Sequence, residues 1–193
     1  MTEMRLTALS LILVSILCAA GPEVPRKASD YAIQTAPDKY IWTNQYAGKT
    51  VILAFILTDC SHCQFTTGLL NAIQKDYADR GVQVLESAVN PMSALQIPEF
   101  KEKFKPAFPI GYNDQKYAAK FLGYPEDDPM FMPQIVIVDR TGTVRAQFAG
   151  DDTRLLKDVQ DKTLRAVLDQ ALGTAQPAQK KGQTANRPSA PKQ

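Results

Sequence analysis

Two short segments dominated by apolar residues, 51–57 and 82–89, flank a stretch whose apolar residues recur at helical spacing. A run rich in β-branched and aliphatic residues is typical of a strand buried on both faces of a parallel sheet, and the helical spacing is typical of one buried helix face. Gly81 supplies the end of that helix. The pattern predicts a right-handed strand–helix–strand unit with a central first strand. The helix residues expected to be buried are Phe65, Leu69, Leu70, Ile73 and Tyr77.

Residues 90–148 predict the rest of one sheet. Two helical stretches, 98–105 and 115–122, lie in a polar segment, and the apolar run 134–139 predicts a third long strand. The apolar and polar residues that alternate over 144–148 fit an antiparallel hairpin partner for that strand. The result is an α/β fold of three layers, in which a central mixed sheet combines the strand–helix–strand unit with a C-terminal antiparallel hairpin and helix.

The last helix is expected to follow the capping residues Asp151 and Asp152 and to end at about Leu172. Its apolar positions recur at helical spacing and predict one buried face. The residues of that face are Leu155, Leu156, Val159, Leu164, Val167, Leu168 and Ala171.

The chain of 193 residues, 45% of them hydrophobic, is long enough for one domain with tails. We expect the domain to cover residues 38–172, with a short edge strand at 40–42. Residues 21–37 are polar with three prolines and predict a linker. Residues 173–193 hold Ala, Pro, Gln and Lys without a large apolar residue and predict a disordered tail.

Residues 1–20 have the pattern of a secretory signal peptide. Arg5 precedes an apolar core over 6–17, and small residues around Ala20 form a cleavage site. The alternatives are an uncleaved membrane anchor and lipidation at Cys18; the bulky Leu17 disfavours lipidation. We therefore expect export, and contact with a membrane only through this segment. The net charge of +2 is spread along the chain, so nothing indicates a nucleic-acid surface.

Cys60 and Cys63 form a CxxC motif directly after the first predicted strand. The motif therefore stands where the strand ends and the helix begins. There the first sulfur meets unpaired backbone N–H groups and the helix dipole, which favour a thiolate. From the residues alone, a local disulfide, a redox dithiol and a two-thiolate metal site are all compatible with this pair.

Three features in this order resemble the thioredoxin-like superfamily. Gly48-Lys49 precede the first long strand, Cys60-Ser61-His62-Cys63 follow it, and Met132-Pro133 precede the third strand. The insertion at 90–129 and the export signal are most similar to the extracytoplasmic TlpA/ResA-like branch, which borders the peroxiredoxins. The resemblance covers about residues 38–172. It implies a thioredoxin-like fold and a thiol-disulfide oxidoreductase without cofactor or metal, acting on protein thiols and disulfides with a membrane or periplasmic redox partner.

The resemblance also implies a role for individual residues. Cys60 matches the exposed nucleophile that forms a mixed disulfide with the substrate. Cys63 matches the resolving thiol that releases the product. Pro133 matches a cis-proline facing the site, which would let the Met132 backbone meet an extended substrate peptide.

This sequence departs from the family pattern in its acidic residues. Ala54 aligns with thioredoxin's buried acid, and Thr66 aligns with a helix glutamate common in TlpA/ResA-like proteins. The usual proton acceptor for the resolving cysteine is therefore missing. Glu86 is the replacement candidate, although an exposed residue at a strand end is the more ordinary explanation of an acid there.

His62 and Asp59 flank the cysteines and are expected to tune the redox couple in opposite directions. An imidazole near Cys60 stabilises the thiolate and makes the disulfide more oxidising, as in DsbA-like proteins, whereas Asp59 opposes it. Asp59 stands where many relatives have tryptophan. The direction of electron flow is therefore left undecided by the sequence.

Two other functions compete with disulfide exchange. Cys60 and Cys63 with help from Met132 offer the soft ligands that Cu(I) prefers, although no CxxxC spacing or distant histidine supports copper delivery. A peroxidase reaction is disfavoured because peroxiredoxins carry threonine three residues before the reactive cysteine, where this chain has Leu57.

Overall fold

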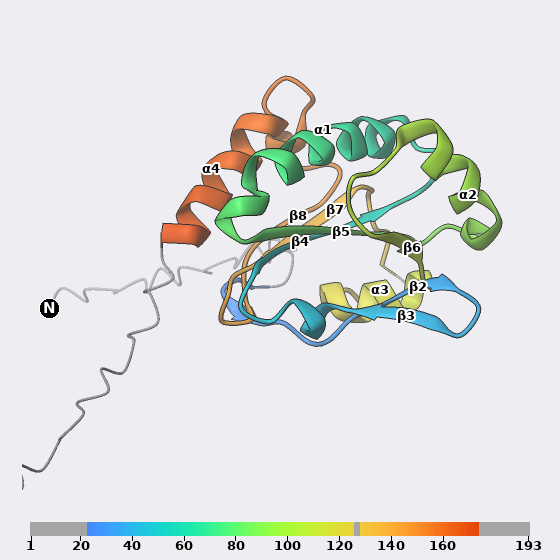
Figure 1. Cartoon of the computed structure of the whole chain (residues 1–193), viewed down its shortest axis with the longest axis horizontal. Helices are drawn as coiled ribbons and strands as arrows, with labels where there is room; N and C mark the ends of the chain where they lie inside the picture. Colours follow the sequence, from blue (N-terminus) through green and yellow to red (C-terminus); the bar gives the residue numbers. More distant parts are fainter. Residues whose placement is uncertain (1–22, 126–127, 174–193) are drawn as a thin grey trace, which may run out of the picture.

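A computed structural model describes residues 23–125 and 128–173, and the chain folds around a single mixed sheet (Figure 1). The strand order is β1-β8-β7-β4-β5-β6-β2-β3. The strands are β1 (Arg26–Lys27), β2 (Ala32–Ala36), β3 (Lys39–Trp42), β4 (Thr50–Ile56), β5 (Val82–Ala88), β6 (Ile110–Tyr112), β7 (Gln134–Val138) and β8 (Thr143–Phe148). The helices are α1 (Ser61–Tyr77), α2 (Ser93–Phe104), α3 (Gln115–Leu122) and α4 (Gln160–Gly173), with short 3-10 turns η1 (Thr43–Tyr46), η2 (Ala78–Arg80) and η3 (Thr153–Leu155).

The centre of the sheet confirms the α/β class with a mixed sheet. β4 pairs in parallel with β5 along its full length, from Thr50↔Val82 to Ile56↔Ala88. On its other side β4 pairs antiparallel with β7, and β7 pairs antiparallel with β8. Every residue of β4 is buried, which is why its sequence is continuously apolar rather than alternating.

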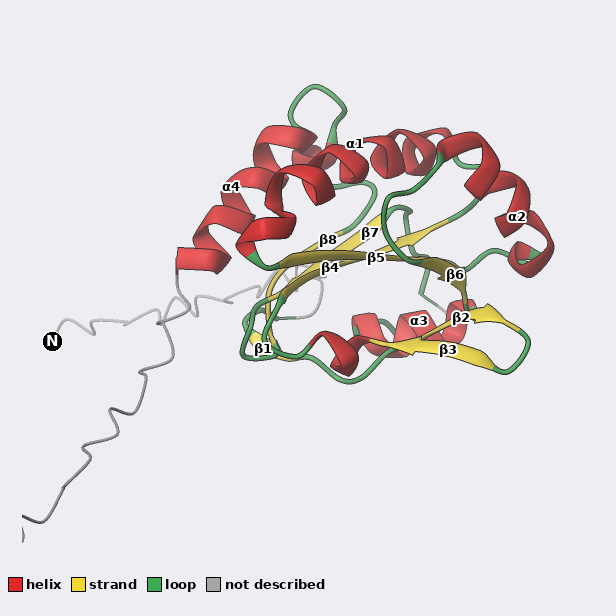
Figure 2. Ribbon diagram, in the orientation of Figure 1, coloured by secondary structure: helices red, strands yellow, loops and turns green. Residues whose placement is uncertain are grey.

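The helices cover both faces of the sheet, so the fold has three layers. Helices α1, α2 and α4 lie on one face, and α3 lies on the other together with the β2–β3 hairpin (Figure 2). Buried side chains of α1 and α4 share a core cluster with Ile52 and Ala54 of β4. The opposite cluster joins Leu53 and Phe55 of β4 to α3. Alternate residues of one strand therefore serve two cores.

Residues 21–37 were predicted to be a linker, and this prediction is wrong for the part that the structure describes. Strand β1 pairs with β8, and β2 pairs with β3 and β6. The physical reason is Tyr31, which is fully buried and packs its ring 5.0 Å from that of Phe55 and 5.3 Å from that of Phe121. One aromatic side chain anchors a segment whose prolines and polar residues indicated irregular chain.

Several boundaries differ from the predicted ones. Helix α2 begins at Ser93 and carries Pro98 in its interior. The Asp152 side chain caps η3, and α4 begins only at Gln160. Three residues predicted to be buried, Phe65, Leu156 and Val159, are exposed. Helix α3 matches its predicted range.

The signal peptide predicted at 1–20 and nearly all of the tail predicted at 173–193 lie outside the described residues. Within the described ranges, no helix has both the length and the apolar character needed to cross a membrane.

Candidate active site

The two cysteines lie where β4 ends and α1 begins. Cys60 is the N-cap residue of α1, and its Sγ accepts a hydrogen bond of 3.2 Å from the Cys63 backbone N–H. Backbone N–H groups at a helix start lack partners within the helix, and this bond gives the Cys63 N–H an acceptor in the Cys60 sulfur. The CxxC motif therefore lies between the end of β4 and the start of α1, as predicted.

The two thiols differ in exposure. Both are free, Cys60 being half-buried and Cys63 fully buried. Burial raises the pKa of the Cys63 thiol above its ordinary value, and the neighbouring Cys60 thiol and the Glu86 carboxyl raise it further. One sulfur can therefore be reached from outside, whereas the other needs a proton acceptor before it can act as a nucleophile.

The loop before Cys60 is held by a network of polar side chains. The Thr58 backbone N–H donates to Asn90 Oδ1 at 3.0 Å, and its hydroxyl donates to Gln96 Oε1 at 2.6 Å. Gln64 of α1 donates from Nε2 to the Thr58 carbonyl at 2.9 Å. The loop is thus tied to α1, to α2 and to the chain after β5, and this fixes the position of Cys60. Asn90 and Gln96 were not predicted from the sequence as site residues.

Met132 packs against the same apolar cluster as the two cysteines, although it is about 70 residues away from them in the sequence. The Met132–Pro133 peptide bond is cis, and Pro133 is buried. Met132 and Cys60 both pack against the apolar cluster that contains Cys63. The structure therefore brings Met132, predicted from the sequence to contact substrate, to the apolar cluster of the two cysteines.

Gly150 supports this segment from the chain after β8. Its backbone N–H donates to the Phe131 carbonyl at 2.8 Å. A Cβ at position 150 would collide with the backbone of Met132, including its carbonyl oxygen. Because backbone atoms cannot rotate away as a side chain can, only glycine permits this approach. In the sequence, Gly150 is a single glycine after a strand, and this signal is too weak to predict a role at the site.

We expect Gly150→Ala to displace the Met132 backbone, to slow disulfide exchange, and to lower the unfolding free energy by about 1–3 kcal/mol because of overpacking. The control is Gly68→Ala, since a Cβ at Gly68 in the middle of α1 meets nothing within 4 Å. That variant is expected to keep the exchange rate and to gain up to about 1 kcal/mol. Denaturant unfolding and an exchange assay measure both. Equal exchange rates and equal stability of the two variants would contradict the support of the Met132 backbone by Gly150.

His62 and Asp59, the predicted tuning residues, have different surroundings. The His62 ring Nε2 lies 2.9 Å from the carbonyl oxygen of Leu155, an acceptor, so Nε2–H is the donor. This bond ties the first turn of α1 to η3. Asp59 is exposed beside a cavity of about 180 Å³ that Glu99 and Lys103 of α2 also line.

The sequence allowed two interpretations of Glu86, a replacement proton acceptor and an exposed residue at a strand end. Glu86 is fully buried, so its interpretation as an exposed strand-end residue is wrong. The cause is α1, which covers this face of β5, with Thr67 above the carboxyl group. Thr66, at the family's glutamate position, accepts a hydrogen bond of 2.9 Å from Gln160 Nε2 and so joins α1 to α4. Neither Thr67 nor Gln160 was predicted from the sequence. The two adjacent threonines Thr66 and Thr67 in a helix predicted to pack on the sheet were a signal for buried hydrogen bonds.

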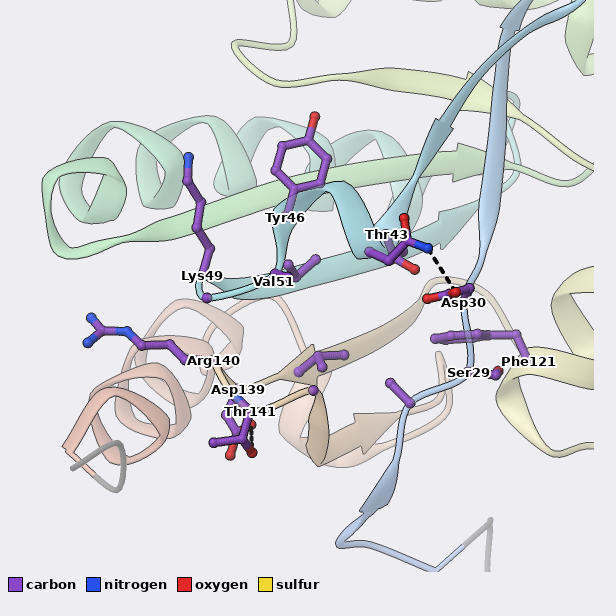
Figure 3. A pocket seen from close by; sticks show the side chains of 16 residues that line it. Ser29, Asp30, Thr43, Tyr46, Lys49, Val51, Phe121, Asp139, Arg140 and Thr141 are labelled. Atoms are coloured by element: carbon purple, nitrogen blue, oxygen red, sulfur yellow. Dashed lines mark hydrogen bonds between the residues drawn. The ribbon is translucent and has the colours of Figure 1, made fainter. Parts of the chain in front are cut away.

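A second cavity lies away from the cysteines. It has a volume of about 220 Å³ and is lined by residues that include Lys49, Val51 and Arg140 (Figure 3). Val51 lies near the start of β4, whereas the cysteines follow the other end of that strand. At its rim Asn44 Nδ2 donates to Asp30 at 2.8 Å. This cavity is separate from the thiol chemistry.

Comparison with known proteins places these features in a family. A protein named thiol-disulfide oxidoreductase ResA from Geobacillus thermodenitrificans is 26% identical over 165 residues, which cover 79% of this chain and 91% of that protein. The thioredoxin-like protein YneN of Bacillus subtilis is 26% identical over 146 residues, covering 74% and 79%. Both names agree with the resemblance drawn from the sequence.

Solved structures confirm the thioredoxin-like fold. A thiol:disulfide interchange protein of the thioredoxin family from Chlorobium tepidum superposes with a TM-score of 0.61 at 21% identity, covering 76% of this chain and 99% of that one. A thiol:disulfide interchange protein from Bacteroides sp. gives 0.59 at 17% identity, covering 75% and 90%. The sequence model of the AhpC/TSA family matches residues 24–147. The chain therefore belongs to the AhpC/TSA family.

Proposed function

We propose that this protein is a thiol-disulfide oxidoreductase of the cell envelope that exchanges disulfides with protein substrates through Cys60 and Cys63. The observation that carries the proposal is the unequal exposure of the two thiols at the start of α1. A static local disulfide gains nothing from such asymmetry, whereas an exchange reaction needs one accessible and one protected sulfur.

The reaction follows from this asymmetry. The Cys60 thiolate, stabilised by the Cys63 N–H, attacks one sulfur of a substrate disulfide and forms a mixed disulfide. The Cys63 sulfur then attacks Cys60 Sγ, which forms the Cys60–Cys63 bond and releases the substrate as a dithiol. Run backwards, the same steps oxidise a substrate. His62 and Asp59 tune which direction is favoured.

The surface around Cys60 supports a polypeptide as the substrate. Phe65 and Phe131 are exposed, the first on α1 just after Cys63 and the second directly before Met132. Leu156 and Val159, between η3 and α4, are exposed as well. Exposed apolar side chains near a reactive sulfur suit an unfolded or extended chain, with the Met132–Pro133 backbone alongside.

The envelope location rests on the predicted export signal at 1–20 and on the similarity to proteins named ResA. An extracytoplasmic dithiol needs a source or a sink of electrons, so a membrane or periplasmic redox partner is part of the proposal. No cofactor is required, because the two electrons reside on Cys60 and Cys63.

The proposal is tested with the full chain in two assays, reduction of insulin disulfides by the reduced protein and oxidation of reduced, unfolded ribonuclease by the oxidised protein. Turnover in either assay supports it and reports the direction of electron flow; a thiol-alkylated sample is the control. No exchange in both assays overturns it. Stoichiometric Cu(I) without exchange would indicate the metallochaperone function instead, and turnover of hydroperoxide without exchange would indicate a peroxidase.

A further inference from the structure

A buried carboxyl group lies directly below the turn of α1 that carries Cys63. Glu86 is on β5, next to Ala54 of β4 in the sheet register. Both residues face α1, and the small Ala54 leaves room for a longer neighbour. The next residue of β5 on this face, Ala88, shares an apolar cluster with Cys63.

The hydrogen bonds around Glu86 indicate where its proton is. The Thr67 hydroxyl lies 3.1 Å from the Cys63 carbonyl oxygen and 2.8 Å from Glu86 Oε1. A hydroxyl has one proton and cannot donate to both acceptors. Both contacts are satisfied when a protonated Glu86 donates to Thr67 and Thr67 donates to Cys63. Among the described residues, Glu86 Oε2 has no partner, which also disfavours a permanent negative charge.

The other elements packed against Glu86 present no compensating charge next to it. Its ladder neighbours are Ala54 on β4 and Ile110 on β6. From α1, the Thr67 hydroxyl contacts it, and the Cys63 thiol lies near enough for the Glu86 charge to raise its pKa. Of these neighbours only the Cys63 thiol can exchange a proton. Burial raises the pKa of Glu86 to about 8, well within reach of neutral conditions.

We propose that Glu86 is the proton acceptor and donor for the Cys63 thiol, an inference that rests on the proposed function. With its pKa at about 8, Glu86 exchanges its proton near neutral pH, so an ionised form is available. In the resolving step, this ionised Glu86 takes the Cys63 proton while the Cys63 sulfur attacks Cys60 Sγ. The Cys60–Cys63 bond forms, the bond between Cys60 and the substrate breaks, and the substrate sulfur leaves as a thiolate that water protonates. Cys63 is oxidised and the substrate sulfur is reduced. In the reverse step, protonated Glu86 returns the proton to the departing Cys63 thiolate.

If Glu86 acted only through its negative charge, Glu86→Gln would change the rate of the resolving step in the opposite direction. A negative Glu86 raises the pKa of the Cys63 thiol, so replacing it with a neutral residue would make the Cys63 thiolate easier to form. Glu86→Gln would then speed the resolving step. If Glu86 accepts the proton, the same substitution removes the acceptor and slows that step. The sign of the change therefore separates the two roles.

The test measures the resolving step in isolation, in full chains with Cys18→Ser so that two thiols react. Cys60 is first coupled to the chromophore 5-thio-2-nitrobenzoate in acid, and its intramolecular release by Cys63 is followed from about pH 5 to about pH 10. We expect Glu86→Gln to slow release about ten-fold or more near neutral pH, a typical contribution of a positioned base. The two rates should approach each other as the pH rises, because hydroxide then increasingly replaces Glu86 as the base.

The matched control is Glu102→Gln, the same change at an exposed position of α2, which should release the chromophore as wild type does. Thr67→Val, which keeps the shape and removes the hydroxyl, should slow release less than Glu86→Gln. Release by Glu86→Gln at the wild-type rate or faster overturns the inference and leaves the proposed function intact. A wild-type chain that never releases the chromophore overturns both.

Discussion

Cys60→Ser is expected to abolish disulfide exchange, and Cys63→Ala is expected to accumulate mixed disulfides with substrates through Cys60. The physical reason is the difference in exposure: only Cys60 can be reached by a substrate sulfur, and only Cys63 lies where it can attack the Cys60 sulfur from inside. With Cys63 removed, the first step still proceeds and the second cannot. Non-reducing electrophoresis and mass spectrometry of the two variants measure the outcome.

The double variant Cys60→Ser with Cys63→Ala is the control, because it should trap nothing. Both single variants must also unfold at a denaturant concentration close to that of wild type. Exchange at the wild-type rate by either single variant would contradict the proposed roles, as would mixed disulfides that form through Cys63.

Glu86→Gln is expected to become progressively more stable than wild type as the pH rises. The folded chain holds the Glu86 pKa at about 8, against 4.5 for an ordinary carboxyl group, because burial disfavours the charge. Below about pH 4.5 the group is protonated in both states and carries no penalty. Between these two values the unfolded chain releases a proton that the folded chain keeps, so wild type loses about 1.4 kcal/mol per pH unit. Above about pH 8 the difference is constant.

The measurement is urea unfolding of both proteins under reducing conditions at several pH values in this window. Glu102→Gln is again the control, and its difference from wild type should stay flat because the side chain is exposed. A flat difference for Glu86→Gln would mean that the buried carboxyl group titrates as it does in the unfolded chain.

Much of the fold could be predicted because its signals are local. A strand buried on both faces must be apolar at every position, so β4 was found from its composition alone. Helix α3 matches its predicted range, because Gly123 ends it in a left-handed conformation; the Asp114 cap at its start was not predicted. Strand β2 was missed because its stability comes from Tyr31, whose aromatic partners lie on β4 and α3.

Part of the candidate site could also be predicted from local sequence signals. The placement of Cys60 and Cys63 follows from a strand that ends and a helix that begins, and Met132–Pro133 followed from family order. The supporting contacts were not local. Gly150 against Met132, and Gln160 on Thr66, join segments far apart in the chain, and neither residue type is distinctive at its position.

The sequence by itself therefore determined the mixed α/β sheet and the position of a CxxC motif at the C-terminal end of its central strand. Only the tertiary structure decided what Glu86 is. An acid in a strand alternates with apolar neighbours whether it faces water or a helix, so its sequence context is the same in both cases. The packing of α1 across β5 closes that face over it, and Thr67 then places a hydroxyl group between the buried carboxyl and the turn that carries Cys63.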